Sequence, residues 1–215
     1  MRFTAPRLVR DSVLLATAAT LGFAIVGFTR ASGSEALKDE WLKGLNGKHG
    51  QIFDTPSESG GIPLIHVMNY YDTYNSAYGV KDSDIDAVIT FYGGVTLHAL
   101  NDAMWSKYKI GEFLKLNGPD GKPATANPWR TAPVILGGPI PGSSIEALQK
   151  RGATTILCNN ALGVFAGLVA KAHGLQQNVV YEDMKANTLP GVELVPAMVI
   201  AIGQAQKAGL TYLRN

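Results

Sequence analysis

The stretch that decides the predicted fold is TTILCNNA, residues Thr154–Ala161. The β-branched, apolar residues Ala153 to Leu157 predict a short buried strand, and Ala161 to Ala172 have the composition of a helix. Cys158, the only cysteine of the chain, therefore falls at a strand-to-helix turn. Parallel α/β sheets hold their ligands and reactive groups at such turns, so this position is the first candidate for a functional site.

Strands and helices alternate on both sides of this stretch. The clearest further strand is Asp86–Tyr92, which is β-branched, aromatic and stopped by two glycines. Other strands are predicted at Gly50–Phe53, Val192–Pro196 and Leu210–Leu213. Helices are predicted at Ile62–Ala77, Val95–Tyr108, Gly111–Leu116, Ile145–Arg151, Gln177–Ala186 and Ala197–Lys207. The alternation predicts an α/β protein with a doubly wound sheet of about five mostly parallel strands.

The N-terminal segment differs from the rest of the chain. Three arginines precede the uncharged, apolar run Ser12–Phe28, which is the pattern of a secretory signal. The length of this run also overlaps that of a short membrane anchor. We expect residues 1–31 to be a signal peptide or an N-terminal anchor, residues 32–47 to form a lead-in helix, and residues 48–215 to form one α/β domain. The domain would then be periplasmic or otherwise exported.

Charge and motif content exclude several classes of function. Residues 1–31 hold four of the 19 basic and one of the 17 acidic residues, which leaves 15 against 16 and a net charge of −1. A stripe of basic residues is therefore missing, and we expect no nucleic-acid partner. The four histidines lie far apart in sequence, so we expect no metal site. Full-length dinucleotide or phosphate loops are also missing, and we expect no cofactor.

The single cysteine allows two interpretations. A helix N-terminus has free N–H groups and a partial positive charge, which favour a thiolate at Cys158. Asn159 and Asn160 can cap the helix that follows, or hydrogen-bond a sulfur species on the cysteine. Alternatively, Cys158 is a small buried hydrophobic residue that closes the strand.

Three further residues are candidates for a binding site around Cys158. His98, on the helix predicted after Asp86–Tyr92, is placed to orient or deprotonate the thiol; the alternative is a half-exposed helix histidine. Tyr92 ends that strand and is a weaker candidate. Trp105 belongs to an aromatic group beside the long loop Asn117–Pro133, and such a group either lines a pocket or anchors the loop or a subunit contact.

The second half of the chain resembles the DsrE/DsrF family, and more narrowly its exported branch. The resemblance rests on LQKRG (Leu148–Gly152), LCNNA (Leu157–Ala161), LVPA (Leu194–Ala197), AQKAGLTY (Ala205–Tyr212) and DAMWSKY (Asp102–Tyr108). It implies a flavodoxin-like three-layer fold and a homo-oligomer, a trimer or hexamer.

The same resemblance implies that Cys158 carries sulfane sulfur as a persulfide and exchanges it with a donor or acceptor protein. Such a protein would be a sulfurtransferase or a sulfur carrier in sulfur relay. The alternative function is a non-catalytic periplasmic ligand-binding or assembly subunit in which Cys158 is structural. A membrane-tethered form of either would require that the N-terminal segment is retained.

Overall fold

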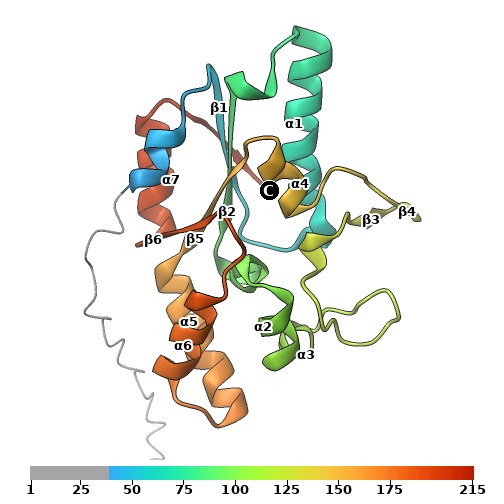
Figure 1. Ribbon diagram of the computed structural model, residues 1–215, viewed down its shortest axis with the longest axis vertical. Coiled ribbons are helices and arrows are strands. Elements are labelled where there is room, and N and C mark those ends of the chain that lie inside the picture. The colour runs from blue at the N-terminus through green and yellow to red at the C-terminus, as the bar shows by residue number, and fades with distance from the viewer. Residues whose placement is uncertain (1–38) are drawn as a thin grey trace, which may run out of the picture. The chain divides into compact units, whose positions relative to one another are not determined.

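Five parallel strands form the central sheet of the computed structural model, which describes residues 39–215 (Figure 1). The strands are β1 (His49–Asp54), β2 (Ile85–Phe91), β5 (Thr154–Cys158), β6 (Val192–Val195) and β7 (Thr211–Arg214). Their order across the sheet is β6-β5-β2-β1-β7, and every neighbouring pair is parallel. The predicted flavodoxin-like α/β fold with five mostly parallel strands is confirmed.

Helices connect the strands and cover both faces of the sheet. The α-helices are α1 (Ile62–Tyr78), α2 (Asp102–Lys107), α3 (Ile110–Leu114), α4 (Ile145–Lys150), α5 (Asn159–His173), α6 (Gln177–Ala186) and α7 (Met198–Lys207). The 3-10 helices are η1 (Asp39–Gly44), η2 (Ser59–Gly61), η3 (Asp82–Asp84), η4 (Gly93–Ala99) and η5 (Pro128–Arg130). A small antiparallel pair, β3 (Val134–Ile135) and β4 (Gly138–Pro139), lies apart from the main sheet. Of the helices within residues 39–215, none is both long and apolar enough to cross a membrane.

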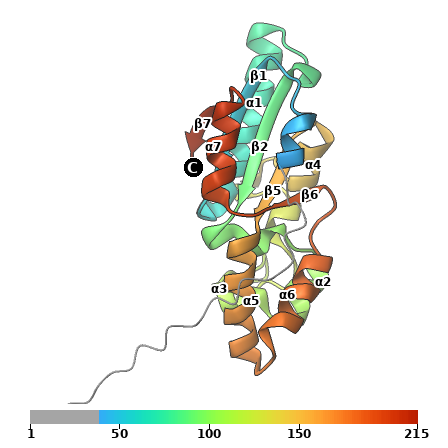
Figure 2. The same ribbon diagram turned by 90° about the vertical axis from the view of Figure 1, so that its left-hand side faces the viewer.

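Side chains alternate along each strand and so divide the core between two faces. Phe53, Ile89 and Leu157 belong to the larger cluster, which packs against α1, α4, α5 and α6. Val88 and Ile156 belong to a smaller cluster, which packs against α7 and η1 (Figure 2). This strict alternation follows from the two-residue period of a strand, and it fixes which functional side chains share a face.

The predicted helix Val95–Tyr108 is wrong as a single element. The chain forms the 3-10 helix η4, becomes extended at Leu100, and begins α2 after Asn101. Leu100 pairs with Thr188, and the Asn101 side chain caps α2 by accepting a hydrogen bond from the Met104 N–H at 3.1 Å. A capping residue in mid-segment and a long-range backbone contact together stop the helix.

The lead-in helix expected over residues 32–47 is observed only from Asp39. There it is the short 3-10 helix η1, whose Trp41 is buried against the smaller cluster. The predicted signal or anchor segment, residues 1–31, lies outside the described residues and stays a prediction.

Candidate functional site

Cys158 is the last residue of β5 and also the N-cap of α5. Its Sγ accepts hydrogen bonds from two backbone N–H groups, that of Ala161 in α5 at 3.4 Å and that of Met198 in α7 at 3.3 Å. The first turns of two different helices therefore converge on one sulfur atom. Because a helix N-terminus has unpaired N–H groups and a partial positive charge, both helices favour negative charge on this sulfur.

The predicted capping by Asn159 and Asn160 is wrong, because the cysteine sulfur itself occupies the capping position. The Asn159 side chain instead accepts a hydrogen bond from the hydroxyl of Tyr181 in α6 at 2.7 Å. The Asn160 N–H donates to the carbonyl of Pro196, just before α7, at 3.3 Å. The two asparagines thus tie the start of α5 to α6 and to the approach of α7, which fixes the position of Cys158.

Cys158 is only 6% exposed and packs in the smaller cluster with Ile156, Val195 and Met198. Its surroundings therefore combine apolar contacts on the sides with two N–H donors at the sulfur. Such a setting excludes most bulk water, while the donors compensate for the lost hydration.

Tyr92 lies beside Cys158 at the carboxyl edge of the sheet. Phe91 of β2 pairs with Leu157 of β5, so Tyr92 and Cys158 each come one residue later and turn to the same face. The Tyr92 hydroxyl donates to Asp54 Oδ1 at 2.6 Å. Burial, reinforced by this hydrogen bond, raises the pKa of Tyr92 above its usual range, so the phenol stays protonated and acts as a donor.

A buried carboxylate organises this part of the edge. Asp54, the last residue of β1, is 2% exposed. Its Oδ2 accepts a hydrogen bond from the Tyr212 hydroxyl at 2.5 Å and lies 3.8 Å from the Arg214 guanidinium. These residues border a cavity of about 380 Å³ against α7, whose lining is completed by Val199, Ile202 and Gln206. The edge thus offers an open hollow lined with phenol, carboxylate and guanidinium groups.

His98 does not approach Cys158. It lies in η4, and its ring contacts Trp105 and Trp129 of the larger cluster with centroid distances of 5.2 and 4.6 Å, whereas Cys158 belongs to the smaller one. The expected half-exposed helix histidine is also wrong, because the side chain is fully buried and neither ring nitrogen has a hydrogen-bond partner. Burial lowers the pKa of His98 to about 3, so the ring is neutral.

Trp105 anchors the long loop rather than lining either described cavity. Its Nε1 donates to the Leu97 carbonyl at 3.0 Å, and its ring is fully buried. Trp129 of the loop is buried on the other side of His98, and the Asn127 side chain donates to the His98 carbonyl at 2.7 Å. Of the two interpretations of the aromatic group, the structure favours loop anchoring.

Sequence reasoning missed Asp54, Tyr212 and Arg214. Asp54 and Arg214 end their strands at the same edge as Cys158, and the side chain of Tyr212, two residues earlier in β7, reaches Asp54. The available signal was the rule that ligands bind outside the carboxyl ends of parallel strands. Applying that rule to the first and last predicted strands would have required knowing that these two strands are neighbours.

Within residues 39–215, no three His, Cys, Asp or Glu side chains come together in a way that would hold a metal ion. Comparison of the sequence with models of known protein families and with curated proteins gives no match. A function is therefore inferred from the geometry of the carboxyl edge and from the motifs around Cys158.

Proposed function

We propose that this chain is an exported DsrE-like protein that binds or transfers sulfane sulfur as a persulfide on Cys158. The observation that supports it most is the pair of N–H donors at the sulfur, from Ala161 and Met198. A thiolate and a persulfide on Cys158 both carry negative charge. N–H donors that are already in place before the reaction stabilise that charge.

The proposed reaction is a transfer between persulfides. The Cys158 thiolate attacks the outer sulfur of a donor persulfide, a new S–S bond forms at Sγ, and the donor's own S–S bond breaks. The donor leaves as a thiolate and takes up a proton, so no net oxidation or reduction occurs. The cavity beside Tyr92 and Asp54 supplies space at the same edge for the group that brings the sulfur.

The remaining parts of the proposal concern location and assembly. We propose a periplasmic or otherwise exported protein that forms a trimer or hexamer and exchanges sulfur with a donor or acceptor protein. If the segment Ser12–Phe28 is retained, the same protein is tethered to the membrane.

A second function, a non-catalytic binding or assembly subunit, is favoured by the burial of Cys158. At 6% exposure in an apolar cluster, the thiol fits a purely structural role. The two functions differ in one observable, which is whether the folded protein accepts sulfur on this residue.

Intact mass of the exported protein, before and after polysulfide treatment, tests the proposal. We expect a sulfur adduct that a reductant removes, and its absence in Cys158→Ser. The serine hydroxyl still accepts the two N–H bonds, so this variant keeps the helix caps and should fold. An adduct retained in Cys158→Ser, or no adduct on the folded parent, contradicts the proposal. The same mass shows whether residues 1–31 have been removed.

A further inference from the structure

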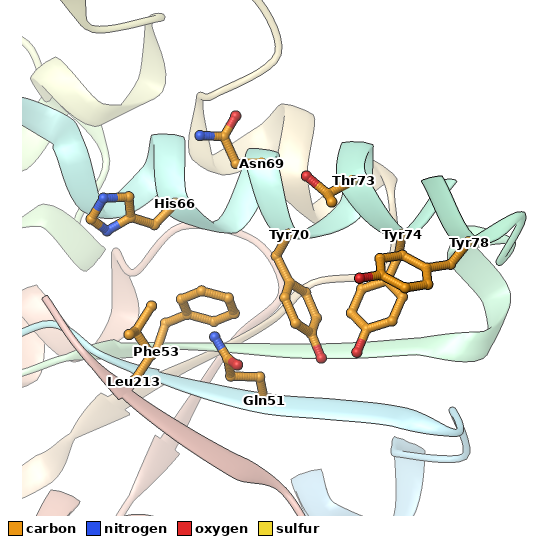
Figure 3. Close-up of a pocket in the computed structure, with 9 residues that line it drawn as sticks. All are labelled: Gln51, Phe53, His66, Asn69, Tyr70, Thr73, Tyr74, Tyr78 and Leu213. Carbon is orange, nitrogen blue, oxygen red and sulfur yellow. The ribbon is translucent and has the colours of Figure 1, made fainter. Parts of the chain in front are cut away.

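A groove runs between α1 and the edge strand β7, on the sheet face opposite Tyr92 and Cys158 (Figure 3). Its volume is about 570 Å³. Tyr70, Tyr74 and Tyr78 follow one another at four-residue spacing and therefore form one row along α1. Phe53 of β1 and Leu213 of β7 form part of the floor.

The tyrosine row is held in place by contacts between its own rings. The Tyr70 centroid lies 5.4 Å from that of Phe53 and 4.9 Å from that of Tyr74, and Tyr74 lies 5.5 Å from Tyr78. The lining includes no carboxylate, lysine or arginine. Burial raises the pKa of Tyr70 above its usual range, so its hydroxyl remains neutral. Apart from His66, the groove is thus an aromatic and uncharged surface.

The strand beside the groove has an open edge. β7 is one of the two edge strands of the sheet, and all four of its residues are exposed. The Asn215 N–H donates to the Asp54 carbonyl at 2.8 Å, which shows that the backbone groups of Asn215 and, by alternation, of Leu213 face β1. The N–H and C=O groups of Tyr212 and Arg214 consequently point away from the sheet. Within residues 39–215 no strand pairs with this edge, and β7 contains neither the proline nor the lysine that often protects one.

The two faces of this edge differ in charge. Leu213 points to the tyrosine groove, whereas Tyr212 and Arg214 line the cavity on the α7 side. The Arg214 side chain is 67% exposed, and Asp54 Oδ2, at 3.8 Å, already accepts the Tyr212 hydroxyl. The guanidinium is therefore available to a carboxylate from outside, on one face only.

We propose that β7 binds an extended peptide segment of a partner protein in which uncharged apolar or aromatic residues alternate with acidic residues. The segment adds to the sheet as a sixth strand and pairs with the outward groups of Tyr212 and Arg214. Its uncharged side chains enter the tyrosine groove, and a carboxylate on its other face contacts the guanidinium. The row from His66 to Tyr78 spans about 18 Å at 1.5 Å per helical residue, the length of about five residues in a strand. This peptide site is independent of the sulfur chemistry proposed for Cys158.

The first experiment measures the affinity of the exported protein for two acetylated, amidated peptides. One alternates valine with glutamate and the other alternates valine with lysine. We expect saturable binding of the glutamate peptide, with slowed hydrogen exchange at the amides of Tyr212 and Arg214. The lysine peptide should bind more weakly, by about fivefold, because an exposed pair of opposite charges contributes up to about 1 kcal/mol and a like pair opposes binding. Failure of the glutamate peptide to bind up to about 1 mM, or equal binding of both, overturns the proposal.

Two N-methylated forms of the glutamate peptide test strand addition without altering any side chain. In one form the odd residues are methylated and in the other the even residues, so each form loses the N–H groups of one edge. Only one edge faces β7, and we expect one form to bind about tenfold or more weakly while the other keeps its affinity. Equal affinities for the two forms would contradict strand pairing.

Variants of the protein locate the two faces of the site. Tyr78→Ser and Arg214→Ala should each weaken binding, because they remove an exposed part of the groove and the cation, respectively. Val179→Ser in α6, which is similarly exposed but belongs to neither face, should leave the affinity unchanged. A dimer whose β7 amides are already protected without peptide, in sedimentation and hydrogen exchange, would assign this edge to a second copy of the chain instead.

Discussion

Acidification should destabilise this protein mainly through His98. The ring lies between Trp105 and Trp129 without a hydrogen bond to either nitrogen, and burial lowers its pKa from 6.5 to about 3. The unfolded chain binds a proton on His98 below about pH 6.5, whereas the folded state keeps the ring neutral down to about pH 3. Stability contributed by the neutral ring is present above pH 6.5 and is lost as the pH falls toward 3.

The size of this loss follows from the two pKa values. At about 1.4 kcal/mol per pH unit, lowering the pH to about 4.5 should remove about 3 kcal/mol of unfolding free energy. The carboxylates of Asp82 and Asp183 have lowered pKa values, so the stability that they contribute is lost only below about pH 3.8. Between pH 8 and 4.5, His98 should therefore contribute more to the change in unfolding free energy than Asp82 and Asp183 do.

Urea unfolding followed by tryptophan fluorescence measures this dependence directly, because two indoles flank the histidine. His98→Leu has a similar volume and cannot titrate, so its unfolding free energy should stay nearly constant from about pH 8 to about 4.5. His173→Gln, at an exposed position in the last turn of α5, should keep most of the loss seen in the parent. Parallel pH profiles for the parent and His98→Leu would refute the reasoning.

Three substitutions test the packing around the candidate site and the loop. Tyr92→Phe should lower the unfolding free energy by about 1–3 kcal/mol in urea titrations, because one oxygen of the buried Asp54 loses its donor. Asn127→Ala removes two side-chain bonds to buried carbonyls and the cap of η5, so limited proteolysis should cut the loop 117–133 faster than in the parent. Gly111→Ala places a Cβ 2.2 Å from the Ala124 carbonyl oxygen, and a thermal melt should show a loss of about 3 kcal/mol or more, or no folded protein. An unchanged melting temperature in Gly111→Ala would show that the loop shifts without cost.

The strands were predictable from sequence because local composition determines them. β2 begins one residue earlier and ends one residue earlier than Asp86–Tyr92, and β5 is displaced by one residue from Ala153–Leu157. The break at Leu100 was not predictable, since it depends on pairing with Thr188, which is remote in sequence. Local propensity favours a helix across that segment, and a tertiary contact prevents it.

The residues of the candidate site likewise fall into those that local sequence indicates and those that only the tertiary structure brings together. Cys158 was identified because a turn after a buried strand is a local feature. The second donor at its sulfur, the Met198 N–H, comes from α7, and no pattern near Cys158 indicates it. Asp54 and Arg214 meet because β1 and β7 are neighbours, a consequence of strand order that local sequence does not encode.

The strand order also explains why the first turns of two helices, α5 and α7, meet at the sulfur of Cys158. β5 and β6 are adjacent, α5 follows β5 and packs with the larger cluster, and α7 follows β6 and packs with the smaller cluster. The strand order itself reverses between β1 and β7, where Asp54 and Arg214 lie, and such a reversal is the point at which open α/β sheets form their ligand crevice. An ordinary buried cysteine needs no hydrogen-bond donors, because apolar contacts suffice for it. Cys158 differs from such a cysteine by the N–H donor that each of the two helices places at its sulfur, and these donors stabilise the negative charge that the proposed persulfide chemistry requires.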